Sequence, residues 1–230
     1  MMKRILWIIL IAPPVLAFMA KPSTFEIKVL GTYTDAIAGN SKERIDLKSL
    51  DLKRKSFGIG LDADSRAEIL IYKGKIFKSS FNNKGIITEK TNNSTASYIV
   101  YTSVRKWESY LLPSTIRSLA DLETEIAKVI ENNNYTGSGT IPFLLIGNPI
   151  SANWHIEVTP GTNKQLNNRG FFFEDKIKAV GFFTTDQQGV ITEMNSRIHV
   201  HVTNKRKEIV GHLDDIKMAG GMTLWMPKLK

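Results

Sequence analysis

The sequence of 230 residues contains no cysteine and only four histidines. The lack of thiols excludes disulfides and thiolate ligands, so any metal must be bound by histidine and carboxylate side chains. Acidic residues are fewer than basic ones: the sequence has 22 Asp and Glu and 31 Lys and Arg, which gives a net charge of +9. The basic residues are scattered, without a recognition helix or an aromatic-interleaved basic stripe. We therefore expect a solvated basic surface and no nucleic-acid partner.

Long apolar runs are absent except at the amino terminus. Residues 1–20 begin with a short basic start and continue with the apolar run Ile5–Met19, the pattern of a secretory signal that is short for a membrane span. We expect cleavage near Ala17 or Ala20 and export to the periplasm or the medium. An uncleaved membrane anchor is the alternative, and no later stretch offers a membrane contact.

The remaining chain predicts many strands and one clear helix. Apolar residues recur at three- and four-residue spacing behind Ser118, which predicts an amphipathic helix over residues 118–131. Two polar segments, residues 34–40 and 82–94, are expected to be loops. The fold class is thus α+β with mixed or antiparallel sheets. We divide the chain into a β-rich half over residues 21–135 and a second over residues 136–230, with a weak similarity of pattern between them.

Three of the four histidines lie close together near the carboxyl end. Alternation around His199 and His201 predicts a strand that places both side chains on one face. A polar turn over residues 204–207 and a second strand over 208–213 complete a hairpin. If Thr203 pairs with Glu208, His199 lies directly opposite His212. The three imidazoles then converge, whereas a three-residue loop would turn His212 to the other face.

Three neutral imidazoles at one point are typical of a Zn²⁺ site. A three-ligand site leaves one position open for water or substrate, as catalytic zinc sites do. A polar hairpin that carries three surface histidines is the alternative. Elsewhere in the chain, Glu68 is an acid at the head of an apolar β-run, where it is either solvent-facing or functional.

The order of these features resembles the acetolactate decarboxylase family. The resemblance covers residues 31–216 and includes the Gly-rich segment at residues 57–60, Glu68, the turn at Lys73-Gly74 and the segment at residues 181–184. The most specific part is the spacing of His199, His201 and the Gly-His pair ending at His212. Two features depart from the family pattern: Glu157 stands where the family has an arginine, and no acidic residue follows Asp215.

The resemblance implies a zinc-dependent decarboxylation of a small 2-hydroxy-3-oxo acid such as acetolactate, which yields acetoin and CO₂. It implies Zn²⁺ on His199, His201 and His212, with Glu68 as the catalytic proton donor. His155, Asp214 and Asp215 are further candidates close to the metal, where an acid can orient a ligand imidazole. A surface histidine and a solvated turn are the alternatives for these three.

Two other functions stay open. A three-histidine zinc site also serves hydration or hydrolysis, so another zinc lyase or hydrolase fits the same residues. An exported zinc-binding homologue without decarboxylase activity also fits, because the arginine and the terminal acid are missing. The pattern is compatible with a homodimer.

Overall fold

The structure is a computed structural model that describes residues 25–64, 66–82, 84–133, 135, 139–158 and 168–229. The expected signal segment at residues 1–20 lies outside these residues. None of the helices in the described part of the chain has the length and apolar character that crossing a membrane requires.

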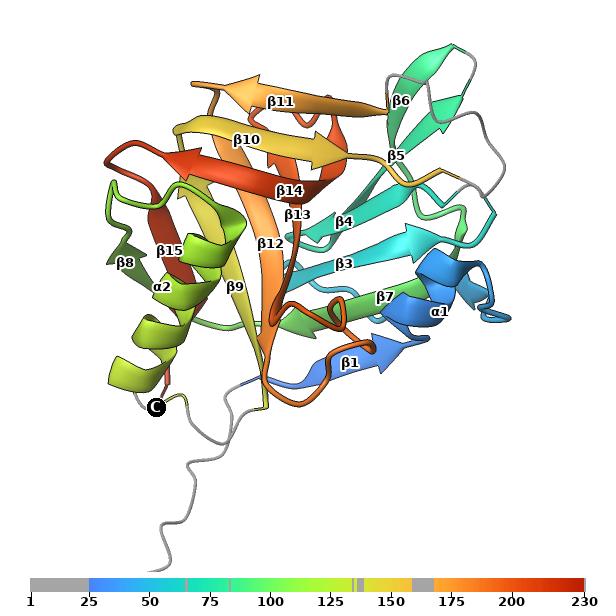
Figure 1. Ribbon diagram of the computed structural model, residues 1–230. Coiled ribbons are helices and arrows are strands. Elements are labelled where there is room, and N and C mark those ends of the chain that lie inside the picture. The colour runs from blue at the N-terminus through green and yellow to red at the C-terminus, as the bar shows by residue number, and fades with distance from the viewer. Residues whose placement is uncertain are drawn as a thin grey trace, which may run out of the picture.

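Two antiparallel sheets make up most of the described chain (Figure 1). The first has the order β1-β7-β3-β4-β5-β6, with β2 beside β7. Its strands are β1 (Ile27–Leu30), β2 (Ile45–Asp46), β3 (Ser56–Asp62), β4 (Glu68–Tyr72), β5 (Lys75–Asn82), β6 (Gly85–Lys90) and β7 (Thr95–Ser103).

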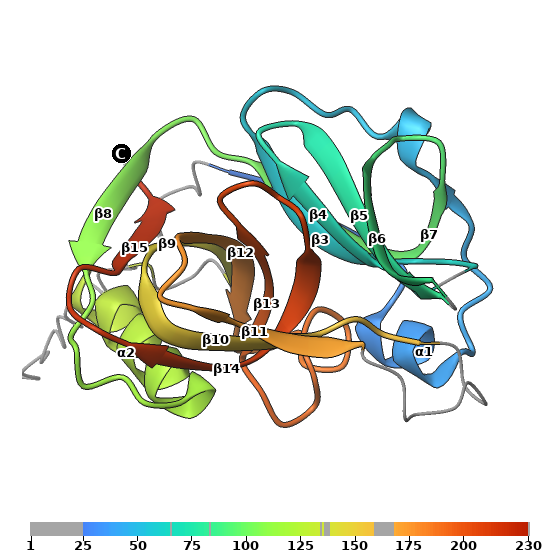
Figure 2. The same ribbon diagram turned by 90° about the horizontal axis from the view of Figure 1, so that it is seen from above.

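The second sheet has eight strands in the order β11-β10-β14-β13-β12-β9-β15-β8 and curls around its own core (Figure 2). Its strands are β8 (Trp107–Leu111), β9 (Thr140–Gly147), β10 (Pro149–His155), β11 (Arg169–Phe173), β12 (Ile177–Thr184), β13 (Ile198–Asn204), β14 (Val210–Met218) and β15 (Thr223–Pro227). The prediction of antiparallel β structure with one main helix is confirmed. β8 precedes that helix in the chain, yet it pairs with β15.

The main helix, α2 (Leu119–Asn132), begins where the sequence predicts. The Ser118 side chain accepts a hydrogen bond from the backbone N–H of Asp121 and so caps the helix. Leu122, Ile126 and Ile130 are buried against the eight-stranded sheet, on its side away from the seven-stranded sheet (Figure 2). The apolar stripe of α2 therefore serves packing, as its spacing indicates.

Both segments that we expected to be loops contain regular structure. Residues 34–40 belong mostly to a short helix, α1 (Tyr33–Ala38), because the Thr32 hydroxyl accepts from the N–H of Asp35 and Gly39 ends the helix at φ 77°. Residues 82–94 contain β6, which pairs with β5. A 3₁₀ turn, η1 (Leu47–Ser49), follows β2.

The two sheets pack face to face and share a core. Leu70 and Tyr98 of the first sheet contact Val180, Phe182 and Val210 of the second within one buried cluster. Since successive residues of a strand point to opposite faces, β4 turns Glu68, Leu70 and Tyr72 towards the second sheet. An acid at the head of β4 therefore lies between the sheets.

Candidate metal centre

The three clustered histidines come from two neighbouring strands of the eight-stranded sheet. On β13, Ile198, Val200 and Val202 face the core beneath α2, so His199 and His201 face the seven-stranded sheet. His212 lies on β14, beside β13. All three rings are buried, with 2%, 0% and 8% exposure for His199, His201 and His212. The alternative of surface histidines on a polar hairpin is therefore wrong.

The register of the hairpin differs from the expected one. His201, and not His199, lies directly opposite His212, and Thr203 pairs with Val210 because the connecting loop is longer than predicted. The shift is two residues, and side chains alternate with a period of two. It therefore moves the ladder along the strand but leaves His212 on the same face as the other two.

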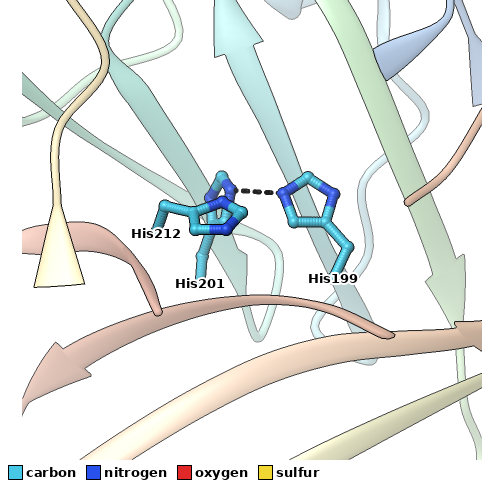
Figure 3. A group of neighbouring side chains, drawn as sticks. All are labelled: His199, His201 and His212. Carbon is cyan, nitrogen blue, oxygen red and sulfur yellow. Dashed lines mark hydrogen bonds between the residues drawn. The ribbon is translucent and has the colours of Figure 1, made fainter. Parts of the chain in front are cut away.

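The three rings meet at one point (Figure 3). One nitrogen from each ring lies within 4.8 Å of the other two. Ring centroids are 4.9 Å apart for His199 and His201, 5.0 Å for His199 and His212, and 5.8 Å for His201 and His212. This cluster can hold a metal ion.

Backbone carbonyls fix how two of the rings present their nitrogens. His199 Nδ1 lies 2.8 Å from the carbonyl oxygen of Ile191, and His201 Nδ1 lies 2.9 Å from that of Ile69. A carbonyl only accepts, so both Nδ1 atoms carry the hydrogen and both Nε2 atoms keep a lone pair. Metal-binding histidines are commonly oriented in this way.

The two Nε2 atoms nevertheless lie 3.1 Å apart. A hydrogen bond between them would require one ring to become an imidazolium. Burial opposes that charge and, together with the neighbouring rings, lowers the pKa of His199, His201 and His212 well below the usual value. A cation shared by the lone pairs removes this conflict, so the residues fit a divalent metal.

Glu68 lies directly beside this cluster and is fully buried. Its Oε2 atom is 3.0 Å from His201 Nε2, and its Oε1 atom accepts a hydrogen bond of 3.1 Å from the backbone N–H of Glu157. Burial raises the pKa of Glu68 to about 8, although His155 acts in the other direction. The solvent-facing alternative for Glu68 is wrong.

His155 lies next to the cluster on β10, directly opposite His212, with ring centroids 4.9 Å apart. Its Nδ1 atom is 2.5 Å from Oδ1 of Asp214, and its Nε2 atom is 3.1 Å from Oε1 of Glu157. Both nitrogens must carry hydrogen to face two carboxylates, so the ring is an imidazolium. Burial lowers its pKa, but the hydrogen bonds to Asp214 and Glu157 outweigh burial and raise it to about 10.

Glu157 and Arg66 extend this row of charges. Oε2 of Glu157 is 3.6 Å from a terminal nitrogen of Arg66, whose side chain is 10% exposed. Arg66 has a left-handed backbone, φ 55°, and donates to the carbonyl oxygen of Ile37. Its buried Nε atom has no hydrogen-bond partner among the described residues. A guanidinium thus lies near the site, although it comes from the β3–β4 connection.

The two neighbouring acids behind His212 have different surroundings. Asp214 contacts His155 and also lies 3.5 Å from Arg169. Asp215 accepts a hydrogen bond of 2.9 Å from the backbone N–H of Leu119 and so holds the start of α2. Of these two candidates, the structure places only Asp214 beside the cluster.

Tyr33 reaches the site from α1 and was missed by sequence reasoning, because its segment looked like a loop. Its ring centroid is 4.6 Å from that of His199, and its hydroxyl lies 3.5 Å from Glu193. Burial raises the pKa of Tyr33, as do Glu193, Glu68 and Glu157, so the phenol stays neutral.

A cavity of about 120 Å³ touches His199 and His212. Leu119, Ser196, Ile198 and Leu213 form part of its wall, with the carboxylates of Glu193 and Asp214. A larger depression of about 820 Å³ lies elsewhere, among Lys28, Lys53 and Arg54. The small cavity matters for chemistry because it reaches two of the clustered histidines.

Solved structures with acetolactate decarboxylase folds superpose on this chain. One is a Staphylococcus aureus protein of unknown function described as similar to alpha-acetolactate decarboxylase, with a TM-score of 0.63 and 16% identity over 87% of this chain and 84% of that one.

Two structures of acetolactate decarboxylase from Bacillus subtilis also match. The enzyme from subspecies spizizenii has a TM-score of 0.67 and that from strain 168 has 0.66, each with 16% identity over 88% of this chain and 86% of its own. No protein-family model matches the sequence, and no curated protein sequence matches it either. The chain therefore shares the acetolactate decarboxylase fold at low sequence identity.

Proposed function

We propose that the chain is a metal-dependent decarboxylase of a small 2-hydroxy-3-oxo acid, similar to acetolactate decarboxylase. One observation carries the proposal: a buried three-histidine cluster, in which the Nε2 lone pairs of His199 and His201 face each other, lies in contact with the buried acid Glu68. The shared fold supports the same class of reaction, and zinc suits a set of imidazole ligands without thiolates.

His199, His201 and His212 would hold the ion. When bound, a Zn²⁺ ion supplies Lewis-acid stabilisation of the negative charge that develops as CO₂ leaves. The protein keeps the three imidazoles neutral through burial and orients two of them through the carbonyls of Ile69 and Ile191. These features prepare the ligands before any metal arrives.

Glu68 is the proton donor of the proposed reaction. The bond between the carboxylate carbon and the hydroxyl-bearing carbon breaks, and its electron pair stays on the remaining fragment. A proton from the Glu68 carboxyl then bonds to that carbon and gives a hydroxyketone, leaving Glu68 as the carboxylate. Its position beside His201 and its burial suit this role. The small cavity favours a short substrate.

A second function is favoured by one specific observation. A carboxylate, Glu157, lies where an arginine would be expected, and Glu193 and Asp214 line the cavity. Acidic surroundings disfavour an anionic substrate. A metal-binding protein of the same fold without decarboxylase activity is therefore the second candidate. Export, cleavage near Ala17 or Ala20 and association as a homodimer stay predictions of the sequence.

Release of acetoin from acetolactate by the purified protein distinguishes the decarboxylase from the metal-binding protein without activity. The decarboxylase predicts turnover that stops when a chelator removes the metal and returns when zinc is restored. Stoichiometric metal without turnover supports the second candidate. Turnover that persists in the His199→Ala/His201→Ala double variant would overturn the metal-dependent reaction.

A further inference from the structure

The carboxylate of Glu157 occupies a position between two cations at the edge of the histidine cluster. Its Oε1 atom is 3.1 Å from Nε2 of His155, and its Oε2 atom is 3.6 Å from a terminal nitrogen of Arg66. The three side chains are only 23%, 13% and 10% exposed, so water screens their charges incompletely. This arrangement is that of a bound carboxylate, except that the carboxylate belongs to the chain.

Glu157 does not use all the hydrogen-bond donors of the neighbouring Arg66. The 3.6 Å separation from Arg66 exceeds hydrogen-bond distance, and the Nε atom of Arg66 is buried without a partner among the described residues. A guanidinium offers five N–H donors in a planar fork that suits a bidentate carboxylate. An unpaired, buried donor on this fork indicates capacity for a further acceptor.

We propose that His155 and Arg66 form an anion subsite of the metal centre, which Glu157 occupies as an internal ligand and which the carboxylate of a small 2-hydroxy acid takes in its place. This assignment rests on the proposed function for its ligand class. It makes Glu157 a specificity-determining residue, since it competes with every carboxylate that enters.

Local charge explains the direction of the effect. His155 and Arg66 contribute two positive charges, and Asp214, which pairs with His155, contributes one negative charge. With Glu157 in place the four groups sum to zero, and without its charge they sum to +1. A tethered carboxylate competes at an effective concentration on the order of millimolar or more, so its removal exposes a site of intrinsically higher affinity.

The backbone contact of Glu157 makes a clean variant available. Its N–H donates to Oε1 of Glu68, and this bond does not involve its side chain. Glu157→Gln removes the negative charge and keeps both the shape of the side chain and the backbone contact. Glu125→Gln is a matched control, because the Glu125 side chain is 24% exposed and also pairs with a cation, Lys128, but on α2.

The test is calorimetric titration of zinc-loaded protein with 2-hydroxy-2-methylpropanoate, which lacks the oxo group and cannot be decarboxylated by this route. We expect Glu157→Gln to bind this anion roughly tenfold or more tightly than the unaltered protein. Glu125→Gln should bind it as the unaltered protein does. The uncharged analogue 2-methylpropane-1,2-diol should show no gain in Glu157→Gln.

Two double variants test whether Arg66 provides the gain in binding. Glu157→Gln/Arg66→Met should lose most of the gain, and Glu157→Gln/Arg66→Lys should retain part of it, which checks that the fold around residue 66 is intact. The inference is overturned if Glu157→Gln binds the anion no more tightly, or if the diol gains equally. Binding of the anion needs no turnover, so the subsite can be detected in a protein that fails to release acetoin. Conversely, a protein that releases acetoin but shows no tighter binding in Glu157→Gln has the proposed function without this subsite.

Discussion

His199 and His201 face each other through Nε2 atoms 3.1 Å apart, while each Nδ1 atom donates to a backbone carbonyl. Two nitrogen lone pairs at this distance repel each other unless a proton or a metal ion lies between them. Burial disfavours the proton by lowering the pKa of both rings. The pair is therefore arranged for a cation.

Binding of zinc should raise the thermal stability of the protein. At a free concentration one hundred times the dissociation constant, the gain is about 2.7 kcal/mol, or roughly 5–11 °C in Tm for a chain of this size. Differential scanning calorimetry with zinc and with a chelator measures it. His201→Asn should abolish most of the shift, and an equal shift in that variant would contradict a site at the cluster.

The metal-free protein should lose stability as the pH falls below about 6.5. The pKa values of His199, His201 and His212 are lowered in the folded state, so the unfolded chain binds protons first, and each ring costs up to about 1.4 kcal/mol per pH unit. Glu68 opposes this trend, because its raised pKa of about 8 makes the folded state bind the extra proton between pH 4.5 and 8.

His155, whose pKa is raised to about 10, also opposes the loss above about pH 6.5, where the unfolded ring is still neutral. Below that pH, three groups against Glu68 leave a net loss on acidification. Urea unfolding in the presence of chelator at pH 7.0, 6.0 and 5.5 measures this slope. His199→Gln should reduce the slope without reversing it. A stability that is flat or rises between pH 7.0 and 5.5 would show that the three rings are not neutral in the folded protein.

Glu68→Gln should separate metal binding from turnover. The amide keeps the volume of the buried side chain but cannot deliver a proton, so acetoin formation should fall roughly 10²- to 10⁴-fold. Metal content by atomic emission should stay at that of the unaltered protein, since the three histidines are untouched. Glu125→Gln on α2 serves as the control, and a loss of activity below tenfold in Glu68→Gln would remove Glu68 from the role of proton donor.

Tyr98 should tune metal affinity from a distance. The carbonyl of Ile191 accepts from His199 Nδ1 at 2.8 Å and from the Tyr98 hydroxyl at 2.9 Å, so Tyr98 helps to fix the group that orients the ligand. Tyr98→Phe should weaken zinc binding roughly threefold to tenfold, below the 10- to 100-fold typical of direct partners. Competition with a chromophoric chelator measures it, and Tyr101→Phe, a buried tyrosine on the same strand, should leave the affinity unchanged.

The sequence was sufficient for features that depend on local periodicity. Alternation around His199 and His201 fixed their common face, and the apolar spacing behind Ser118 fixed α2 almost to the residue. The register was predicted wrongly by two residues, yet His212 stayed on the right side because a strand has period two. The same patterns failed at residues 82–94, where polar composition hid a strand that pairs at the edge of its sheet.

Only the tertiary structure decided which distant groups meet the cluster. Nothing local marks Tyr33 as a neighbour of His199 or Arg66 as a partner of Glu157, since packing of the two sheets brings them together. Burial is likewise a property of the assembled sheets, and it sets the neutral state of the three imidazoles and the raised pKa of Glu68. The sequence determines which residue types are present, but their protonation states and partners depend on how the two sheets pack together.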